Sequence, residues 1–500
     1  MNPISRKVAA ILTIAALGSA SLPNAVSNVQ AANQPSPSAA ASQLSDQAIQ
    51  AAVKELHKLG IMQGYLNQMN EYNQTSRAEL AKLVYKAFDL EDKADEPAEL
   101  TDVNANAWYY DYAAKLVGLG IMEAENGIFN PQGKVTDAEL AQVVSKALER
   151  DAKSVQYWMA AFYSASGSAS RGETAYLIQT ARKAIPSEHA KITSVRALNA
   201  ITMIVTFDKP LTAADEGFAI AKENFSFDND LTLTNMPRLK TGSIATYIVP
   251  TSVQQAGTTY TLTYKSKKAG STLGSAAKVN MTAASQVTSD TFELESLKVN
   301  GVVDYGYIIS AYSGGRGANA FILNDREQAN GTTYQIIPSM QARQVLLTPE
   351  NGSPIMAKYV PFTQSTDGKQ EPKFRLPEGQ TLTPGVKYTV TSDWANISSS
   401  SFVAKKFEPL QIKSVEAMSE TSIQVTLAQD PGDELFSGRS MVLTAPNGDK
   451  LLATYKYSSR KGAVGVFDIA DNGTIQAGTT YTVAPADEWA TASAVTVTME

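Results

Sequence analysis

Three copies of a four-residue pattern near the N-terminus constrain the fold more than any other feature of the chain. In each copy a Ser or Thr is followed three residues later by Glu, which is the signature of a capping box at the start of a helix. The hydroxyl accepts a hydrogen bond from the third helical amide, and the Glu side chain accepts one from the amide of the capping residue. The copies are Ser76-Arg77-Ala78-Glu79, Thr136-Asp137-Ala138-Glu139 and Ser170-Arg171-Gly172-Glu173. We therefore expect a helix to begin at each copy, with the capping residues Ser76, Glu79, Thr136, Glu139, Ser170 and Glu173.

Two of the copies carry an arginine that capping does not explain. A cation at the first helical position lies against the positive end of the helix dipole, where an acid is preferred. One interpretation is an exposed arginine whose placement costs only about a few tenths of a kcal/mol. The other is that free amides, the dipole and the guanidinium together form an anion-binding site. Because the second copy has Asp137 at this position, we expect that copy to be structural or altered in its binding.

Longer motifs recur around these helix starts. Gly60-Ile61-Met62 returns 60 positions later as Gly120-Ile121-Met122, the same offset that separates the first two capping patterns. The second copy is preceded by Asp102-Val103 and Trp108, and it is followed by Gly127-Ile128-Phe129-Asn130-Pro131. In this order the motifs resemble the S-layer homology (SLH) domain, over residues 45–187. The first repeat lacks the acid-Val and Trp opening and the third is shortened, so we expect repeats at 45–95, 96–150 and 151–188.

The SLH resemblance implies a fold, a partner and a set of binding residues. The fold is an all-α pseudo-threefold bundle, and the partner is a secondary cell-wall polysaccharide, often one that carries pyruvate ketals. The family's Thr-Arg-Ala-Glu arginine corresponds to Arg77 and Arg171, whose forked guanidinium groups suit a ketal carboxylate. Gly64 either lets the backbone approach a sugar or is a turn glycine, and Trp108 and Trp158 either pack between helices or stack on a sugar ring. The glycan-binding residues we expect are Arg77, Arg171, Gly64 and Trp158.

The N-terminal segment has the features of an export signal. Arg6 and Lys7 precede a short apolar run at 8–17, and Val29-Gln30-Ala31 provides a small-residue cleavage site. We expect a signal peptide at 1–31, a flexible linker at 32–44 and a secreted protein without membrane insertion, because no other apolar run is long enough to span a bilayer. The net charge of −6 argues against a nucleic-acid partner. The chain has no cysteine, which excludes disulfides and thiol chemistry.

Beyond residue 188 the apolar residues alternate with the period of β-strands. Ile192-Thr193-Ser194-Val195 returns 220 positions later as Ile412-Lys413-Ser414-Val415, and each copy is followed by Gly-Thr-Thr-Tyr-Thr, at 257–261 and 478–482. A related Gly-Val-Lys-Tyr-Thr at 385–389 closes a longer middle module that we expect to open near Leu294, with an insertion in 312–331 or 364–371. This pattern resembles bacterial Ig-like domains. We expect β-sandwiches at 189–287, 288–406 and 407–500.

The fold class that follows is multidomain, an all-α SLH bundle followed by all-β Ig-like sandwiches. Only His57 and His189 occur and no motif nominates a catalytic pair of acids, so we expect no enzymatic activity. Asp228 and Asp230 have calcium-like spacing without the rest of an EF-hand loop, so calcium there is an alternative to a polar turn. We expect non-covalent anchoring to the cell wall and self-assembly of the β region into a surface layer. The alternative is an SLH-anchored surface enzyme or adhesin that uses one of the sandwiches.

Overall fold

The computed structural model describes residues 44–500 except 65–67, 93–95, 297, 300–301, 304–321, 330, 362–370 and 433–434. The expected signal peptide and most of the expected linker lie outside the described residues. The same holds for most of the two segments in which we expect an insertion. No helix within the described ranges is long and apolar enough to cross a membrane.

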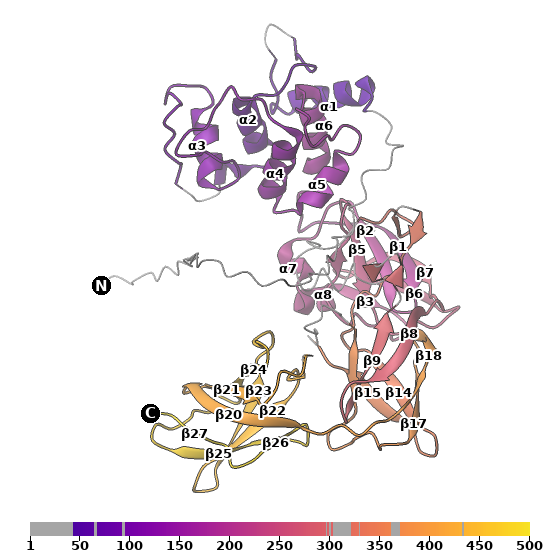
Figure 1. Ribbon diagram of the computed structural model, residues 1–500. Coiled ribbons are helices and arrows are strands. Elements are labelled where there is room, and N and C mark those ends of the chain that lie inside the picture. Colours follow the sequence, from indigo (N-terminus) through magenta and orange to yellow (C-terminus); the bar gives the residue numbers. More distant parts are fainter. Residues whose placement is uncertain are drawn as a thin grey trace, which may run out of the picture. The chain divides into compact units, whose positions relative to one another are not determined.

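The first part of the described chain is helical, drawn in indigo to magenta in Figure 1. Its elements are α1 (Asp46–Lys58), α2 (Arg77–Ala87), the 3₁₀ turn η1 (Leu90–Asp92), α3 (Tyr110–Gly118), α4 (Asp137–Leu148), α5 (Ala152–Trp158) and α6 (Arg171–Arg182). The helices α2, α4 and α6 begin directly after the three expected capping residues. A single hydrophobic core contains fully buried leucines from all three repeats, among them Leu56, Leu80, Leu140 and Leu177. The repeats therefore fold around one shared core rather than as separate units.

Two small sheets follow, with the strand orders β1-β2-β5-β4 and β3-β6-β7. The strands are β1 (Ile192–Asn199), β2 (Thr202–Phe207), β3 (Phe225–Phe227), β4 (Arg238–Leu239), β5 (Thr246–Pro250), β6 (Thr259–Tyr264) and β7 (Lys267–Leu273). Two short helices, α7 (Ala213–Glu216) and α8 (Phe218–Asn224), lie between β2 and β3. The sequence pattern did not predict them. A local signal was nevertheless present, because the side chain of Thr212 caps α7 by accepting a hydrogen bond from the amide of Asp215.

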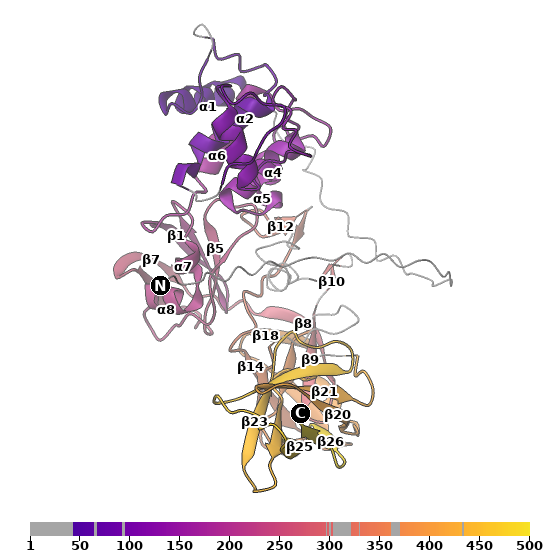
Figure 2. The same ribbon diagram turned by 90° about the vertical axis from the view of Figure 1, so that its left-hand side faces the viewer.

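Sixteen of the remaining strands form two eight-stranded sheets that share one topology, and several of these strands are labelled in Figures 1 and 2. The first has the order β18-β8-β9-β16-β15-β14-β17-β19, and the second has the order β26-β20-β21-β24-β23-β22-β25-β27. In each, the opening strand pairs in parallel with a late strand, β8 with β18 and β20 with β26. The strands of the first are β8 (Val279–Gln286), β9 (Thr291–Ser296), β14 (Gln344–Pro349), β15 (Ile355–Tyr359), β16 (Lys373–Arg375), β17 (Lys387–Thr391), β18 (Ala395–Ser399) and β19 (Ser401–Val403). Those of the second are β20 (Leu410–Ser419), β21 (Ser422–Leu427), β22 (Ser440–Thr444), β23 (Lys450–Tyr455), β24 (Val464–Ile469), β25 (Thr480–Pro485), β26 (Ala490–Ala492) and β27 (Thr496–Thr498).

The expected start of the middle module is wrong. The strand β8 pairs with β9 and β18 and so opens the second β domain, whereas a boundary at 287/288 would have assigned it to the first. Leu294 accordingly lies in β9, the second strand of that domain. The sequence pattern did not mark β8 as the opening strand of the second domain, because only small and polar residues lie between its apolar positions. Four two-residue strands lie between β9 and β14: β10 (Lys298–Val299), β11 (Val302–Val303), β12 (Gln328–Ala329) and β13 (Thr332–Thr333).

The sequence repeats of the β region correspond to repeated geometry. The pairing of β1 with β2 and that of β20 with β21 have the same register, with irregularities at the same two places. The glycine of each Gly-x-x-Tyr-Thr motif has a positive φ, 78° at Gly257, 84° at Gly385 and 72° at Gly478, which explains the choice of glycine. In all three motifs the tyrosine hydroxyl accepts a hydrogen bond from the amide five residues earlier, at 2.8, 2.9 and 3.1 Å.

Candidate functional site

The three helix starts are joined by a closed ring of backbone hydrogen bonds. The amide of Thr75 donates to the carbonyl of Ala169, the amide of Ala169 donates to Val135, and the amide of Val135 donates to Thr75, at 3.0 to 3.1 Å. Each of these residues precedes one of the capping residues by one position. The strand-like contacts Ser76–Lys134, Thr136–Ser168 and Gln74–Ser170 extend the same ring. Each repeat is therefore completed by a backbone segment of another repeat.

The first amide of each of these helices is already hydrogen-bonded. The amides of Arg77, Asp137 and Arg171 donate to the carbonyls of Gly133, Gly167 and Asn73, each in another repeat. The sequence-based hypothesis assumed that free helix-start amides would contribute to an anion site. That part of the hypothesis is wrong, because the loop of a neighbouring repeat occupies the amides.

The capping interactions differ between the three copies. Reciprocal capping boxes form at Ser76 with Glu79 and at Ser170 with Glu173. At the second copy the hydroxyl of Thr136 accepts from the amide of Glu139, but the reciprocal bond does not form. The carboxylate of Glu139 instead forms an ion pair with Arg77 of the first repeat. The second helix start thus has half a capping box and a contact to its neighbour.

Both arginines bind a neighbouring repeat through matching sets of partners. Arg171 forms an ion pair with Glu79, and its guanidinium donates to the carbonyls of Met69 and Gln63 at 3.0 and 2.9 Å. Its relative exposure is only 8%. The carboxylate of Glu79 thereby serves both its own helix cap and the arginine of the third repeat. We conclude that Arg171 joins the third repeat to the first.

Arg77 uses partners that lie 60 positions after those of Arg171. It pairs with Glu139, and its guanidinium donates to the carbonyls of Phe129 and Glu123 at 2.8 and 2.6 Å. The same guanidinium lies 4.8 Å from the centre of the Phe129 ring, a cation–π distance. Burial lowers the pKa of Arg77, against the smaller opposing effects of nearby carboxylates. Arg77 therefore joins the first repeat to the second as Arg171 joins the third to the first.

Asp137 closes the remaining junction in a different way. Its side chain is buried, and its carboxylate accepts a hydrogen bond from the amide of Ser164 at 2.8 Å. Burial raises the pKa of Asp137, the Ser164 amide acts in the opposite direction, and the charge of Glu173 raises it further. The expectation that this copy would be structural agrees with these contacts, since the acid holds the shortened loop of the third repeat.

A groove of about 1040 Å³ opens where the first repeat meets segments of the other two. Lys82 and Lys134 line it, together with Arg171, and the indole of Trp108 is 57% exposed at its wall. The ammonium of Lys82 lies 5.6 Å from the Trp108 ring centre and donates to the side-chain oxygen of Gln63 at 2.7 Å. Burial and, to a lesser degree, the charge of Lys86 lower the pKa of Lys82. The amide side chains that line the groove are Gln63, Asn70, Asn73, Gln74 and Gln132.

The expected glycan-binding residues do not all lie at this groove. Arg171 and Gly64 line it, whereas Arg77 and Trp158 are not among its lining residues. Local packing explains the glycine at position 64, since any side chain there would collide with the carbonyl of Gln68. Trp158 is buried, and its indole N–H donates to the carbonyl of Gly242 at 2.9 Å, which agrees with the packing alternative. The sequence analysis missed Lys82 and Lys134, because a single lysine on a helix or loop carries no motif.

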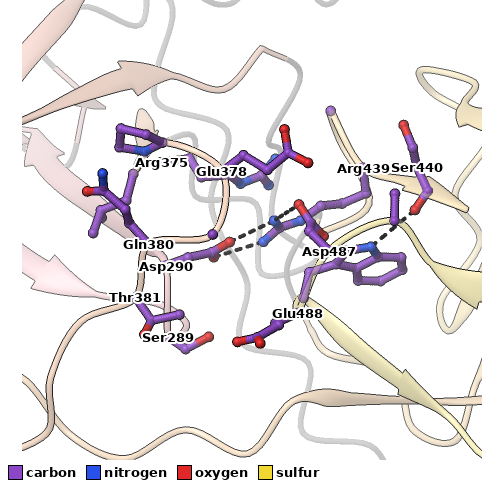
Figure 3. A pocket seen from close by; sticks show the side chains of 16 residues that line it. Ser289, Asp290, Arg375, Glu378, Gln380, Thr381, Arg439, Ser440, Asp487 and Glu488 are labelled. Atoms are coloured by element: carbon purple, nitrogen blue, oxygen red, sulfur yellow. Dashed lines mark hydrogen bonds and ion pairs between the residues drawn. The ribbon is translucent and has the colours of Figure 1, made fainter.

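A second polar pocket, of about 220 Å³, lies in the β region, and several charged side chains line it (Figure 3). The carboxylate of Asp290 accepts two hydrogen bonds from Arg439, at 2.7 and 2.8 Å, and the two side chains face each other in Figure 3. Burial alone would raise the pKa of Asp290, but the hydrogen bonds and charge of Arg439 lower it to about 2. The guanidinium of Arg375 nearby donates to the carbonyl of Ser437 at 2.9 Å. Such a bidentate ion pair holds two β domains together and does not present a free binding group.

The acidic segment around Asp228 has the geometry of a turn. The carboxylate of Asp228 accepts from the amide of Thr261 at 2.6 Å. Asn229 and Asp230 both have positive φ, and the Asn229 side chain donates to the carbonyl of Thr259. Within the part of the chain that the structure describes, no group of three or more His, Cys, Asp or Glu residues could hold a metal ion. The polar-turn alternative accounts for these residues.

Comparison with known proteins finds a family match for one segment of the helical region. Residues 99–141 match the family described as the S-layer homology domain. The Surface-layer 125 kDa protein of Lysinibacillus sphaericus is 37% identical over 100 residues, which are 20% of this chain and 8% of that protein. The matched part is thus a small fraction of the relative's length.

Solved structures of other surface proteins show only distant likeness. Domains 1–6 of the surface layer protein SbsC align with 91% of this chain and 73% of that chain at 12% identity, with a TM-score of 0.16. The Escherichia coli adhesin FdeC aligns with 62% of this chain and 96% of that chain at 12% identity, with a TM-score of 0.15. Scores this low do not establish a common arrangement. Residues 99–141 of the helical region thus match the S-layer homology domain, and 100 residues of the chain are similar to the surface-layer protein of Lysinibacillus sphaericus.

Proposed function

We propose that the helical region anchors the protein non-covalently to an anionic glycan of the cell wall, and that the glycan lies in the groove at Trp108. The observation that carries this proposal is the composition of the groove. It combines an exposed indole, a row of side-chain amides and two lysines. An indole face suits the apolar face of a sugar ring, and amides suit its hydroxyl groups. The lysines favour an acidic sugar even though the whole chain is acidic.

The acidic group that we propose is the carboxylate of a pyruvate ketal on a secondary cell-wall polysaccharide. It would be held by Lys82 and Lys134 at the groove, with Arg171 contributing the guanidinium donors that Glu79 and the carbonyls of Met69 and Gln63 leave unused. Gly64 would lie under the sugar. In this proposal Arg77 supports the fold and is not in contact with the glycan at this groove. The related surface-layer protein supports a location at the cell surface.

We further propose that the three repeats form the pseudo-threefold bundle that SLH domains imply. The ring of backbone bonds through Thr75, Val135 and Ala169 supports this, because each repeat uses the same position to reach the next. The two arginine clamps at equivalent positions support it as well. The β domains would then project from the wall and assemble with other copies into a surface layer. Negative-stain microscopy of the purified chain, with and without added calcium, tests assembly by the presence or absence of ordered sheets.

Sedimentation with purified cell-wall sacculi tests the anchoring. The chain from residue 32 onward should sediment with native sacculi and remain in solution with sacculi from which the secondary polymer has been extracted. Trp108→Ala should weaken binding about tenfold, because an aromatic contact of about 1.5 kcal/mol is lost. Ile128→Ala is the matched control, since Ile128 is 54% exposed but is not among the groove residues. Equal sedimentation with native and extracted sacculi would refute the proposal.

A further inference from the structure

We propose that the groove at Trp108 is the one repeat junction that binds the acidic glycan, with one glycan per chain, and that Lys82 and Lys134 give it this selectivity. The inference rests on the proposed glycan-binding function and specifies its stoichiometry. It also departs from the expectation drawn from the arginines, which would give one site for Arg77 and another for Arg171.

The closed ring gives every groove position a counterpart at the other junctions. The first junction lies at α2 and includes the loop before α4, through the contact of Ser76 with Lys134, and Arg171, which pairs with Glu79 of α2. The second lies at α4 and includes the loop before α6, through Thr136 and Ser168, and Arg77, which pairs with Glu139 of α4. The third lies at α6 and includes the loop before α2, through Ser170 and Gln74, and Asp137, which accepts from the amide of Ser164 in the loop before α6. Charges at matching positions can therefore be compared directly.

The clearest difference between the first and second junctions lies in one pair of side chains. At the first junction the ammonium of Lys82 donates to the side-chain oxygen of Gln63 at 2.7 Å. At the second, 60 positions later, the side-chain amide of Gln142 donates to the carboxylate of Glu123 at 3.2 Å. The contact is the same, but its charge changes from +1 to −1. Lys146, 3.2 Å from Glu123, offsets that acid and leaves the second junction without a surplus of positive charge.

The position of Lys134 also carries a positive charge at the first junction and none at the other two. Lys134 is exposed at the first junction, and its counterpart at the second is Ser168. At the third junction the position of Lys134 is taken by Gln74, and that of Lys82 by Tyr176. The third junction also has the buried acid Asp137 where the others have an arginine. Both lysine positions are therefore cationic only at the first junction.

The arginines cannot distinguish the first junction from the second. Arg171 and Arg77 bind matching carbonyls, and each is paired with the Glu of a neighbouring helix start. Each arginine therefore has one carboxylate partner at its junction. Selectivity for an anion must come from the groups that differ, and these are the lysines.

Titration calorimetry on residues 32–500 tests the inference. The probe is a pyruvylated fragment of the wall glycan, and the same fragment without the ketal is the reference. The wild type should bind one pyruvylated fragment per chain. Lys82→Gln and Lys134→Gln should each weaken binding about tenfold, as expected for loss of a hydrogen bond to a charged group. Lys146→Gln, a change of the same charge at the second junction, should change the affinity less than about twofold.

A transplant variant provides the converse test. Gln142→Lys, Ser168→Lys and Glu123→Gln together copy the charges of the first junction onto the second and should raise the stoichiometry from one to two. A wild-type stoichiometry of two or three would overturn the inference. So would affinities that the two lysine substitutions leave unchanged, or a transplant variant that still binds one fragment. No binding of the fragment by the wild type would overturn the proposed function itself, which separates the two failures.

Discussion

The helical and β regions both arose by repetition, but they use it in opposite ways. In the helical region one hydrophobic core contains residues of all three repeats, and every repeat contributes to a contact that another repeat completes. In the β region the third domain has a separate core of its own, whereas the cores of the first two meet in a small cluster of Ile204 and Ile248 with Leu323 and Ile336. Removing one helical repeat would expose the core residues of the other two, whereas the third β domain would keep its own core if another domain unfolded. A destabilising substitution should therefore affect all three helical repeats in the first case and one domain in the second.

The largest expected effect is on the clamp of the third repeat. Arg171→Met removes the guanidinium and leaves Glu79 without its cation beside two carbonyls that lose their donor. Breaking a buried pair by removing one partner typically costs about 3–5 kcal/mol. Thermal unfolding followed by helical circular dichroism should show the loss, and the β domains should unfold as in the wild type. Arg326→Ala, at an exposed arginine, should stay within about 0.5 kcal/mol of the wild type.

A core substitution in the third β domain should have a large but confined effect. Leu443 is fully buried in β22, and Leu443→Ala should destabilise that domain by about 2–5 kcal/mol through lost burial and a cavity. Calorimetry should show one transition moving to lower temperature while that of the helical region stays in place. Leu452→Ala, on the neighbouring strand but 43% exposed, is the matched control and should cost less. A downward shift of the helical transition as well would contradict the separation of the two regions.

Sequence reasoning succeeded where the cause was local. A capping box joins residues three positions apart, and the three helices begin where the hydroxyl residues predicted. The tyrosine motifs of the β domains have the same character, since their hydrogen bond spans five residues. Such contacts can be derived from the spacing of residue types alone.

The partners of the arginines could not be derived in this way. Arg171 reaches residues 92, 102 and 108 positions away, and nothing in its own repeat indicates them. The boundary before β8 failed for a related reason, because that strand is assigned by pairing with β9 and with the distant β18. Lys82 and Lys134 come together at one groove only when the three repeats fold into a ring. Contacts between residues far apart in the sequence decide the arginine partners, the β8 boundary and the groove, and the spacing of residue types in one sequence does not reveal such contacts.

Breaking the ion pair of Asp290 with Arg439, between the second and third β domains, should lower the free energy of unfolding by an intermediate amount that depends on pH. The pKa of Asp290 is lowered to about 2, below the ordinary value, so its contribution to stability is present above pH ~4 and is lost as the pH falls towards 2. A shift of this size corresponds to about 2 kcal/mol. Asp290→Asn should be less stable than the wild type by that order at pH 7, and the difference should shrink at pH 2. Glu420→Gln, at an exposed acid, should show no comparable pH-dependent difference in denaturant unfolding.

The smallest expected effects distinguish the helix caps. Ser76→Ala and Thr136→Ala each remove a hydroxyl that accepts a helical amide, at a cost of about 1 kcal/mol. Glu79 takes part in both the cap and the Arg171 clamp, so the effect of Ser76→Ala should depend on whether Arg171 is present. Thr136 has no reciprocal bond with Glu139, so Thr136→Ala should combine additively with substitution of Arg77. A double-mutant cycle measured by denaturant unfolding should therefore give a coupling of about 0.5 kcal/mol or more at the first cap and less at the second. Equal coupling at the two caps would mean that the clamp does not act through Glu79, and the helical repeats would then be less interdependent than the ring of contacts indicates.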